Sequence, residues 1–278
     1  MEVALTRGLS HPNIVRALRH ASFNSQNASL AVLQDSEVGS MDSWDSLWDQ
    51  EALEPPSSYS SRHNLEDNQE TWLMLEYCDK GSLLDAVDRG WLYTRRASHF
   101  TGVTDLKKLL LTALELANAL AYLHSVDVMH GDLTGGNVLL HSSPITPTDP
   151  RGFTVKVADF GMSRIQEDSK QTAGQGTLTH MPPELIRHAQ LHRSADVWAF
   201  GILLWEMYSG RRAWLGLSYK QVMQAVGYEQ RAPDWPADAP PELAAAARSC
   251  CNAEPDERPT FRQLLGQLTG MLSCSQSS

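Results

Sequence analysis

Two short stretches decide the fold: HGDLTGGNVLL at residues 130–140 and VKVADFGMS at residues 155–163. The first has the pattern of a polar turn between a long helix and a strand. The second has the pattern of a strand that ends in an acid followed by Phe-Gly. Phosphoryl transfer from a nucleotide needs a group that positions the acceptor hydroxyl and oxygen ligands for Mg²⁺. Asp132 is the candidate base, and Asn137 and Asp159 are the candidate metal ligands.

Hydrophobic periodicity around these stretches predicts a few strands followed by many helices. Apolar residues from Asp105 to His124 lie on one helical face, which predicts a long helix there. Strands are predicted over 14–23, 71–76, 138–140 and 154–158, and further helices over 195–208, 218–226, 241–251 and 260–272. Residues 2–9 have the pattern of the end of a helix. This order favours an α+β fold with two unequal lobes.

Length and composition set the broad class. The 278 residues are 42% hydrophobic and 20% charged, as in an ordinary globular protein of one large domain or two small lobes. No apolar run approaches the roughly 18 residues of a membrane helix, and the N-terminus lacks a signal-peptide pattern. Four cysteines, two of them adjacent and none in a Cys-x-x-Cys pair, give neither a disulfide framework nor a zinc site. We therefore expect a cytoplasmic location.

The acidity of the chain is concentrated in one segment. Residues 24–70 carry ten acids and one base, so this segment holds −9 of the formal net charge of −10. Its Ser, Asn and Gln content predicts a disordered insert. Within it, MDSWDSLWDQEAL at 41–53 has apolar residues at helical spacing and is either a docking helix for a partner or an unstructured loop. The absence of a basic stripe argues against nucleic acid as a partner.

Beyond these patterns, the chain resembles the eukaryotic protein kinase family over nearly its whole length outside the acidic insert. HGDLTGGN stands where the family has its His-Arg-Asp catalytic loop, and Asp159-Phe160-Gly161 matches its metal-binding motif. GTLTHMPPE at 176–184, ADVWAFG at 195–201 and ERPT at 257–260 match segments of the large lobe. The sequences of these segments are similar to those of Ser/Thr or tyrosine-kinase-like members of the family, as in green algae and plants.

The resemblance implies roles for individual residues. Asp132 would be the catalytic base, positioned by Thr177, and Asn137 and Asp159 would hold Mg²⁺. Asp196 would brace the backbone of the catalytic loop, and Arg258 would pair with Glu184. For ATP, the resemblance assigns Glu2 as the helix-C glutamate, Leu75 as gatekeeper, backbone groups of Glu76 and Cys78 as adenine partners, and Leu139 as the residue under the purine.

The resemblance also implies a bilobal kinase-like fold with a truncated β-rich small lobe and a mainly helical large lobe. Residues 1–77 would be the partial small lobe, including the insert at 24–70; 78–273 would be the large lobe and 274–278 a tail. The implied activity is transfer of the γ-phosphate of ATP, with Mg²⁺, to Ser/Thr hydroxyls of protein substrates in signal transduction.

Three departures from the family pattern stand out: the start of the sequence, Gly131 and Thr134. The sequence starts at the helix-C glutamate, so the glycine-rich loop and the strand-three lysine (Val-Ala-Ile-Lys) are absent from it. Lys156, near Asp159, is expected to face solvent and not to replace that lysine. Gly131 stands in place of the arginine that receives an activation-loop phosphate, so no dependence on such phosphorylation is expected. Thr134 stands in place of a lysine, which predicts low turnover.

Two other functions remain open on the sequence. A pseudokinase or interaction module is favoured by the missing lysine and opposed by the retained Asp132, Asn137 and Asp159. Small-molecule phosphotransferases share His-Gly-Asp with Asn five residues later, but they lack the Pro-Pro-Glu, Asp-Val-Trp-Ala-Phe-Gly and Glu-Arg-Pro-Thr segments. A truncated gene or fragment of a longer kinase is the favoured account of the missing strands.

Overall fold

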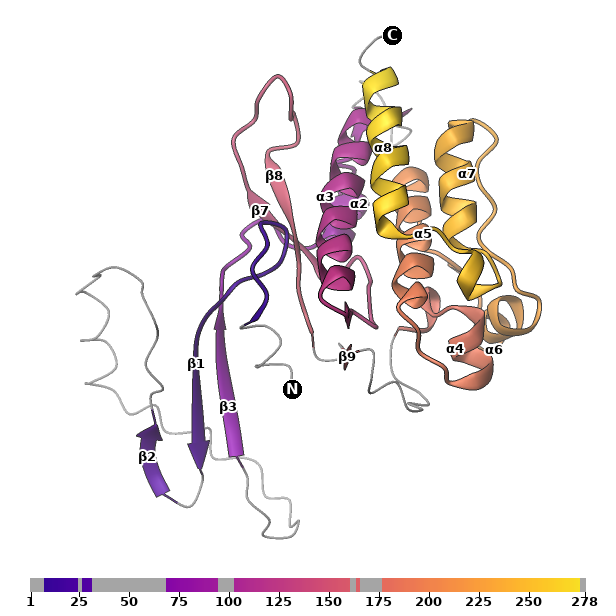
Figure 1. Ribbon diagram of the computed structural model, residues 1–278. Helices are drawn as coiled ribbons and strands as arrows, with labels where there is room; N and C mark the ends of the chain where they lie inside the picture. The colour runs from indigo at the N-terminus through magenta and orange to yellow at the C-terminus, as the bar shows by residue number, and fades with distance from the viewer. Residues whose placement is uncertain are drawn as a thin grey trace. The chain divides into compact units, whose positions relative to one another are not determined.

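The computed structural model describes residues 8–24, 27–31, 69–94, 103–160, 164–165 and 177–275. The chain forms two compact units (Figure 1). The smaller unit is Ala17–Leu75, and the larger unit combines Met1–Arg16 with Glu76–Ser278. The predicted lobe boundary at residue 77 stays a prediction. Glu2 lies outside the described residues.

The smaller unit is an antiparallel sheet of β1 (Ala17–Asn24), β2 (Asn27–Ala31) and β3 (Gln69–Leu75) in the order β2-β1-β3. The register of β1 and β3 pairs Ala17 with Leu75 and Asn24 with Gln69. The strand predicted over 71–76 is therefore confirmed in β3.

The predicted disorder of segment 24–70 is wrong where strands occur in it. All of β2 and the first residues of β3 fall inside this segment. These parts of β2 and β3 are polar and lack the alternation of apolar residues that predicts a strand. They form strands because they pair with β1 through backbone hydrogen bonds. Residues 32–68, with the docking stretch 41–53, lie outside the described residues.

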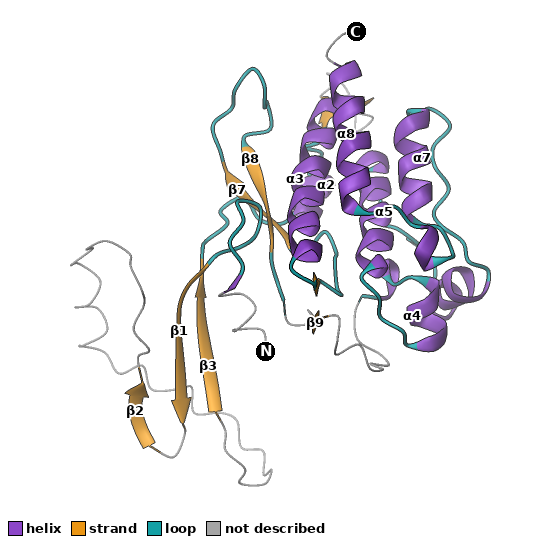
Figure 2. Ribbon diagram, in the orientation of Figure 1, coloured by secondary structure: helices purple, strands orange, loops and turns teal. Residues whose placement is uncertain are grey.

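The larger unit is mainly helical (Figure 2). Its strands are β4 (Tyr93–Thr94), β5 (Val103–Thr104), β6 (Val128–Met129), β7 (Val138–Ser142), β8 (Phe153–Val157) and β9 (Arg164–Ile165). Its α-helices are α2 (Leu83–Asp88), α3 (Leu106–Ser125), α4 (Pro183–His188), α5 (Ser194–Ser209), α6 (Tyr219–Val222), α7 (Pro241–Cys250) and α8 (Phe261–Ser275). Its described residues also form the short turns η3 (Leu178–His180) and η5 (Pro255–Glu257) and the π-helical η4 (Met223–Tyr228). Helix α8 extends two residues into the predicted tail at 274–278.

Helix α3 confirms the long amphipathic helix of the sequence. It begins where the side chain of Asp105 accepts a hydrogen bond from the backbone N–H of Lys108, a common N-terminal cap. One face is fully buried, with Leu109, Leu116 and Leu120 at 0% exposure. That face packs against α8 and β8, so α3 lies at the centre of the hydrophobic core.

Helix α5 has no polar face over most of its length. Residues from Ala195 to Leu204 are all buried, as expected of a helix surrounded by core. It packs against α7, and Gly201 makes this approach possible. A Cβ at Gly201 would lie 2.7 Å from Cys251 Sγ and 2.8 Å from the Cβ of Cys250.

The β7–β8 hairpin positions the two stretches that opened the sequence. On one edge, the backbone N–H of Val15 donates to Val157 O at 2.8 Å. On the other edge, the N–H of Leu140 donates to Gly81 O at 2.8 Å. The strand predicted over 14–23 is therefore wrong at its start, because residues 14–15 pair with β8 and β1 begins only at Ala17.

A buried ion pair connects α4 to the segment before α8. Arg258 donates to both carboxylate oxygens of Glu184 at 2.7 Å, and it also donates to Ser194 O and Asn252 O. Both residues are buried. The predicted pairing of Arg258 with Glu184 is confirmed.

Within the described part of the chain, we find no helix that is both long and apolar enough to span a membrane.

The close contact at Gly201 gives a prediction with a matched control. Gly201→Ala should lower the free energy of unfolding by about 1–3 kcal/mol, because the added methyl group overlaps Cys251. Gly266→Ala, on an open face of α8, should raise it by about 0.5–1 kcal/mol through helix propensity. Urea unfolding followed by circular dichroism measures both. Equal shifts in the two variants would contradict the packing account.

The buried ion pair gives a second prediction. Arg258→Ala should lower the free energy of unfolding by about 3–5 kcal/mol, because it leaves the Glu184 carboxylate buried and unpaired. The exposed Arg262 lies four residues away, and Arg262→Ala should change the free energy by less than about 0.5 kcal/mol. A cost for Arg258→Ala no larger than that of the control would show that the pair contributes nothing to stability.

Candidate active site

The catalytic-loop stretch lies between β6 and β7 and is held by Asp196. One carboxylate oxygen of Asp196 accepts from the backbone N–H of His130 at 2.9 Å, and the other accepts from Gly131 N–H at 2.9 Å. His124 Nε2 lies 2.8 Å from the same carboxylate. Burial by itself would raise the pKa of Asp196, but the hydrogen bond and charge of His124 and the charge of His130 outweigh it. The pKa is therefore held below its ordinary value.

Gly131 turns the backbone at the start of this loop. Its φ of +81° lies in the left-handed region, which glycine adopts without strain. An arginine at this position would have to adopt an unfavourable backbone conformation in the loop as it stands. The departure from the family pattern at Gly131 therefore matches the local geometry.

Asp132 is held through both its backbone N–H and its side chain. Its own N–H donates to His130 Nδ1 at 3.3 Å. Its carboxylate oxygen Oδ1 accepts from the backbone N–H of Thr177 at 2.8 Å. The structure thus brings Thr177 to Asp132, but through the main chain and not through the hydroxyl group. His180, buried at the end of η3, donates its N–H to Thr177 O at 2.9 Å and supports this turn.

Asn137 and Asp159 come together because their strands are paired. Val138 faces Val157 in the β7–β8 register, and Ala158 N–H donates to Asn137 O at 2.9 Å. Asp159, the next residue, is exposed and has a φ of +62°, an uncommon conformation for a residue other than glycine. Gly161 lies outside the described residues.

The oxygen ligands of Asn137 and Asp159 at this end of the hairpin fit Mg²⁺. Asn137 Nδ2 donates to Asp132 O at 2.8 Å, and among the described residues its Oδ1 has no hydrogen bond. A carboxylate from Asp159 and an amide oxygen from Asn137 are the hard ligands that this ion prefers. Thr134, found in place of the family lysine, accepts from Asn137 N–H through its hydroxyl group at 3.4 Å.

The residues expected to contact adenine lie on the segment before α2 and on β7. Glu76 N–H donates to Arg16 O at 2.9 Å, so this donor is already used. Among the described residues, the N–H and C=O of Cys78 and the C=O of Glu76 have no hydrogen-bond partner. Leu139, half-buried in β7, forms a bridge with Ser82. Burial raises the pKa of the Cys78 thiol, and the charge of Glu76 raises it further.

The prediction that Lys156 faces solvent is wrong. Lys156 Nζ lies 2.9 and 3.1 Å from the two carboxylate oxygens of Glu76, and its side chain is 14% exposed. The alternation of β8 does turn Lys156 away from the core, but Glu76 covers that face. Sequence reasoning missed this pair because the partners are 80 residues apart.

Sequence reasoning also missed two histidines near the site. His124 binds Asp196, and its only signal was a polar residue in the last turn of α3. His180 Nε2 lies 3.5 Å from Glu206 of α5, and both side chains are buried. The GTLTHMPPE match located His180, but nothing in the pattern identified Glu206.

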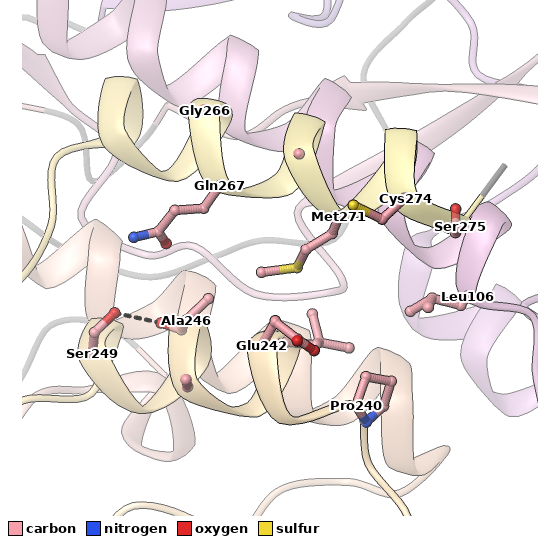
Figure 3. A pocket seen from close by; sticks show the side chains of 13 residues that line it. Leu106, Pro240, Glu242, Ala246, Ser249, Gly266, Gln267, Met271, Cys274 and Ser275 are labelled. Carbon is pink, nitrogen blue, oxygen red and sulfur yellow. Dashed lines mark hydrogen bonds between the residues drawn. The ribbon is translucent and has the colours of Figure 1, made fainter. Parts of the chain in front are cut away.

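A separate groove lies between α7 and α8 (Figure 3), and no residue of the catalytic loop lines it. Its volume is about 690 Å³. Met271 and Gln267 project into it from α8 and Glu242 from α7, with Leu106 at one end. Its walls are mostly apolar and carry none of the predicted site residues, so it supplies no group to the chemistry considered above.

Comparison with known proteins places this geometry in a family. The sequence model described as "Protein tyrosine and serine/threonine kinase" matches residues 61–268. A "Mitogen-activated protein kinase kinase kinase" from Drosophila melanogaster is 30% identical over 167 residues, which are 59% of this chain. The chain spans only 14% of that curated relative. The family match confirms the predicted mixed α+β kinase fold. The chain therefore belongs to the protein tyrosine and serine/threonine kinase family.

Proposed function

We propose that this chain is a kinase domain that transfers the γ-phosphate of ATP to Ser or Thr hydroxyls of protein substrates. The observation that carries the proposal is the fixed Asp132 carboxylate, which accepts from Thr177 N–H at 2.8 Å. Asn137 Nδ2 donates to Asp132 O at 2.8 Å, and Asp159 follows Ala158, whose N–H donates to Asn137 O. This set supplies a base and two oxygen ligands, as phosphoryl transfer requires.

In the proposed reaction, Asp132 orients the acceptor hydroxyl and accepts its proton. The hydroxyl oxygen forms a bond to the γ-phosphorus as the bond from phosphorus to ADP breaks. One carboxylate oxygen of Asp132 is held by Thr177 N–H, so the carboxylate does not rotate freely. Asp196, through Gly131, fixes the backbone from which Asp132 projects.

The same proposal places ATP and Mg²⁺. Asn137 and Asp159 would hold Mg²⁺, which neutralises charge on the phosphates. Adenine would bind the backbone groups of Glu76 and Cys78 that lack hydrogen-bond partners among the described residues, with Leu139 against the purine. Glu2, the expected helix-C glutamate, is kept only as a sequence-based assignment.

Support for Ser/Thr acceptors comes from the sequence. The Gly-Thr before Pro-Pro-Glu resembles Ser/Thr and tyrosine-kinase-like members of the family. The name of the relative from Drosophila says that it acts on another protein kinase. We propose that this chain likewise acts in signal transduction. The four free cysteines fit a reducing cytoplasm as its location.

Removing the base tests the mechanism. Asp132→Asn should lower the rate of phosphate transfer from radiolabelled ATP to casein by at least about 100-fold. Thr177→Ala is the matched control and should keep the rate within about threefold, because its contact is a backbone N–H. An Asp132→Asn chain as active as the wild type would refute the assignment. An inactive wild-type chain that still binds MgATP would favour an interaction module.

The acceptor is tested on the same labelled casein. Acid hydrolysis and separation of phosphoamino acids should give phosphoserine and phosphothreonine. Phosphotyrosine as the main product would contradict the Ser/Thr assignment while leaving the kinase assignment intact.

A further inference from the structure

A hollow of about 710 Å³ lies at the other end of the β7–β8 hairpin from Asn137. Its walls come from the segments that flank α2, from β4, from α3 and from the hairpin loop. The volume is within the usual range for ligand sites, roughly 300–1,000 Å³. None of the residues discussed for phosphate transfer lines it.

The charged residues that line this hollow are basic, whereas the chain as a whole is acidic. Among the described residues that line it, the four charged ones are all basic: Lys80, Arg89, Lys108 and Arg151. The chain as a whole carries 33 acids and 23 bases. The charged groups that line the hollow itself therefore favour acidic ligands over basic ones.

Two of these cations have no ion pair among the described residues. Arg151 is neutralised by Asp149 at 2.7 Å and Glu115 at 2.9 Å, and Lys108 lies 3.6 Å from Asp105. Lys80 and Arg89, in contrast, have no carboxylate within 4 Å in the described part of the chain.

The Arg89 guanidinium lies 5.8 Å from the centre of the Trp91 ring. A contact with the face of the ring does not use the N–H groups of the guanidinium, so Arg89 can still donate charged hydrogen bonds to an incoming carboxylate.

The ring of Trp91 forms part of the remaining wall, with the buried Phe153 behind it. The ring centres of Trp91 and Phe153 are 6.2 Å apart and tilted. Trp91 is only partly buried, and Ile145 at the rim is 73% exposed. Such a wall offers packing to an aromatic or apolar side chain beside the cations.

We propose that this hollow, the cationic groove, binds an acidic peptide segment with an aromatic side chain on the protein substrate. Carboxylates of the segment pair with Lys80 and Arg89, and its aromatic side chain packs against Trp91. The proposal rests on the proposed protein kinase activity for its purpose, since it names how that activity selects substrates.

The hairpin also sets the spacing between the groove and the site of transfer. Strand β7 runs from Val138, the residue after Asn137, to Ser142, and five residues of strand span about 17 Å. A substrate that occupies both places needs an extended linker of at least about five residues between its acidic segment and its acceptor hydroxyl.

Binding is tested without ATP, so that the result does not depend on catalysis. The probe is a fluorescein-labelled peptide, Glu-Asp-Trp-Glu-Glu-Trp-Asp-Glu, and fluorescence anisotropy follows its binding to the full chain. The Lys80→Gln, Arg89→Gln double variant should weaken binding about tenfold. The control double variant Lys220→Gln, Arg262→Gln removes the same charge from exposed sites elsewhere and should bind like the wild type. Lys108→Gln alone should weaken binding by a smaller factor.

Three results would overturn the proposal. They are no saturable binding of the probe, equal binding to the groove and control variants, or equal binding of a peptide with every acid replaced by its amide. Circular dichroism checks that each variant is folded. Asp132→Asn should bind the probe like the wild type, so a failed kinase assignment and a failed groove assignment give different results.

Discussion

The hydrogen bonds to the Asp196 carboxylate are the constraint on which the candidate site depends. A buried carboxylate is costly unless it is fully hydrogen-bonded. Asp196 is 1% exposed and meets this requirement with two backbone N–H groups of the catalytic loop and His124. The same bonds that stabilise the charge therefore fix the conformation of residues 130–131. Because α5 is buried on all sides, the loop takes its position from the core.

The same helix supports Asp132 from the opposite side. Glu206 of α5 lies 3.5 Å from His180, whose N–H bonds to Thr177 O, and Thr177 N–H bonds to Asp132. Asp132 is thus held by Asp196 through the catalytic loop and by Thr177 on the other side, where Glu206 approaches His180 without a hydrogen bond. This arrangement explains how one apolar helix, with no group near the acceptor, can control the geometry of a reactive carboxylate.

The sequence predicted what local patterns and short motifs carry. Hydrophobic periodicity predicted α3 and α5. The order of the motifs selected Asp132, Asn137 and Asp159, and the pairing of β7 with the next strand along the chain, β8, brings the last two stretches together. Prediction from the sequence failed where contacts between distant residues determine the structure. The environment of Lys156 is set by Glu76, which is 80 positions away. Composition could not predict β2, which β1 holds through backbone bonds. A motif names Thr177 but does not distinguish its N–H from its hydroxyl group.

The packing at Gly201 has a consequence for the redox chemistry of the chain. The cysteines that fill this contact are adjacent in sequence, and burial raises the pKa of Cys251 to about 12 and that of Cys250 well above its usual value. Thiolates are the reactive form of cysteine, so these two side chains stay protonated and resist oxidants and alkylating reagents at neutral pH. Cys250 packs as a small apolar group and Cys251 donates to Trp198 O at 3.8 Å, so oxidative damage to this protein should begin elsewhere than at this contact.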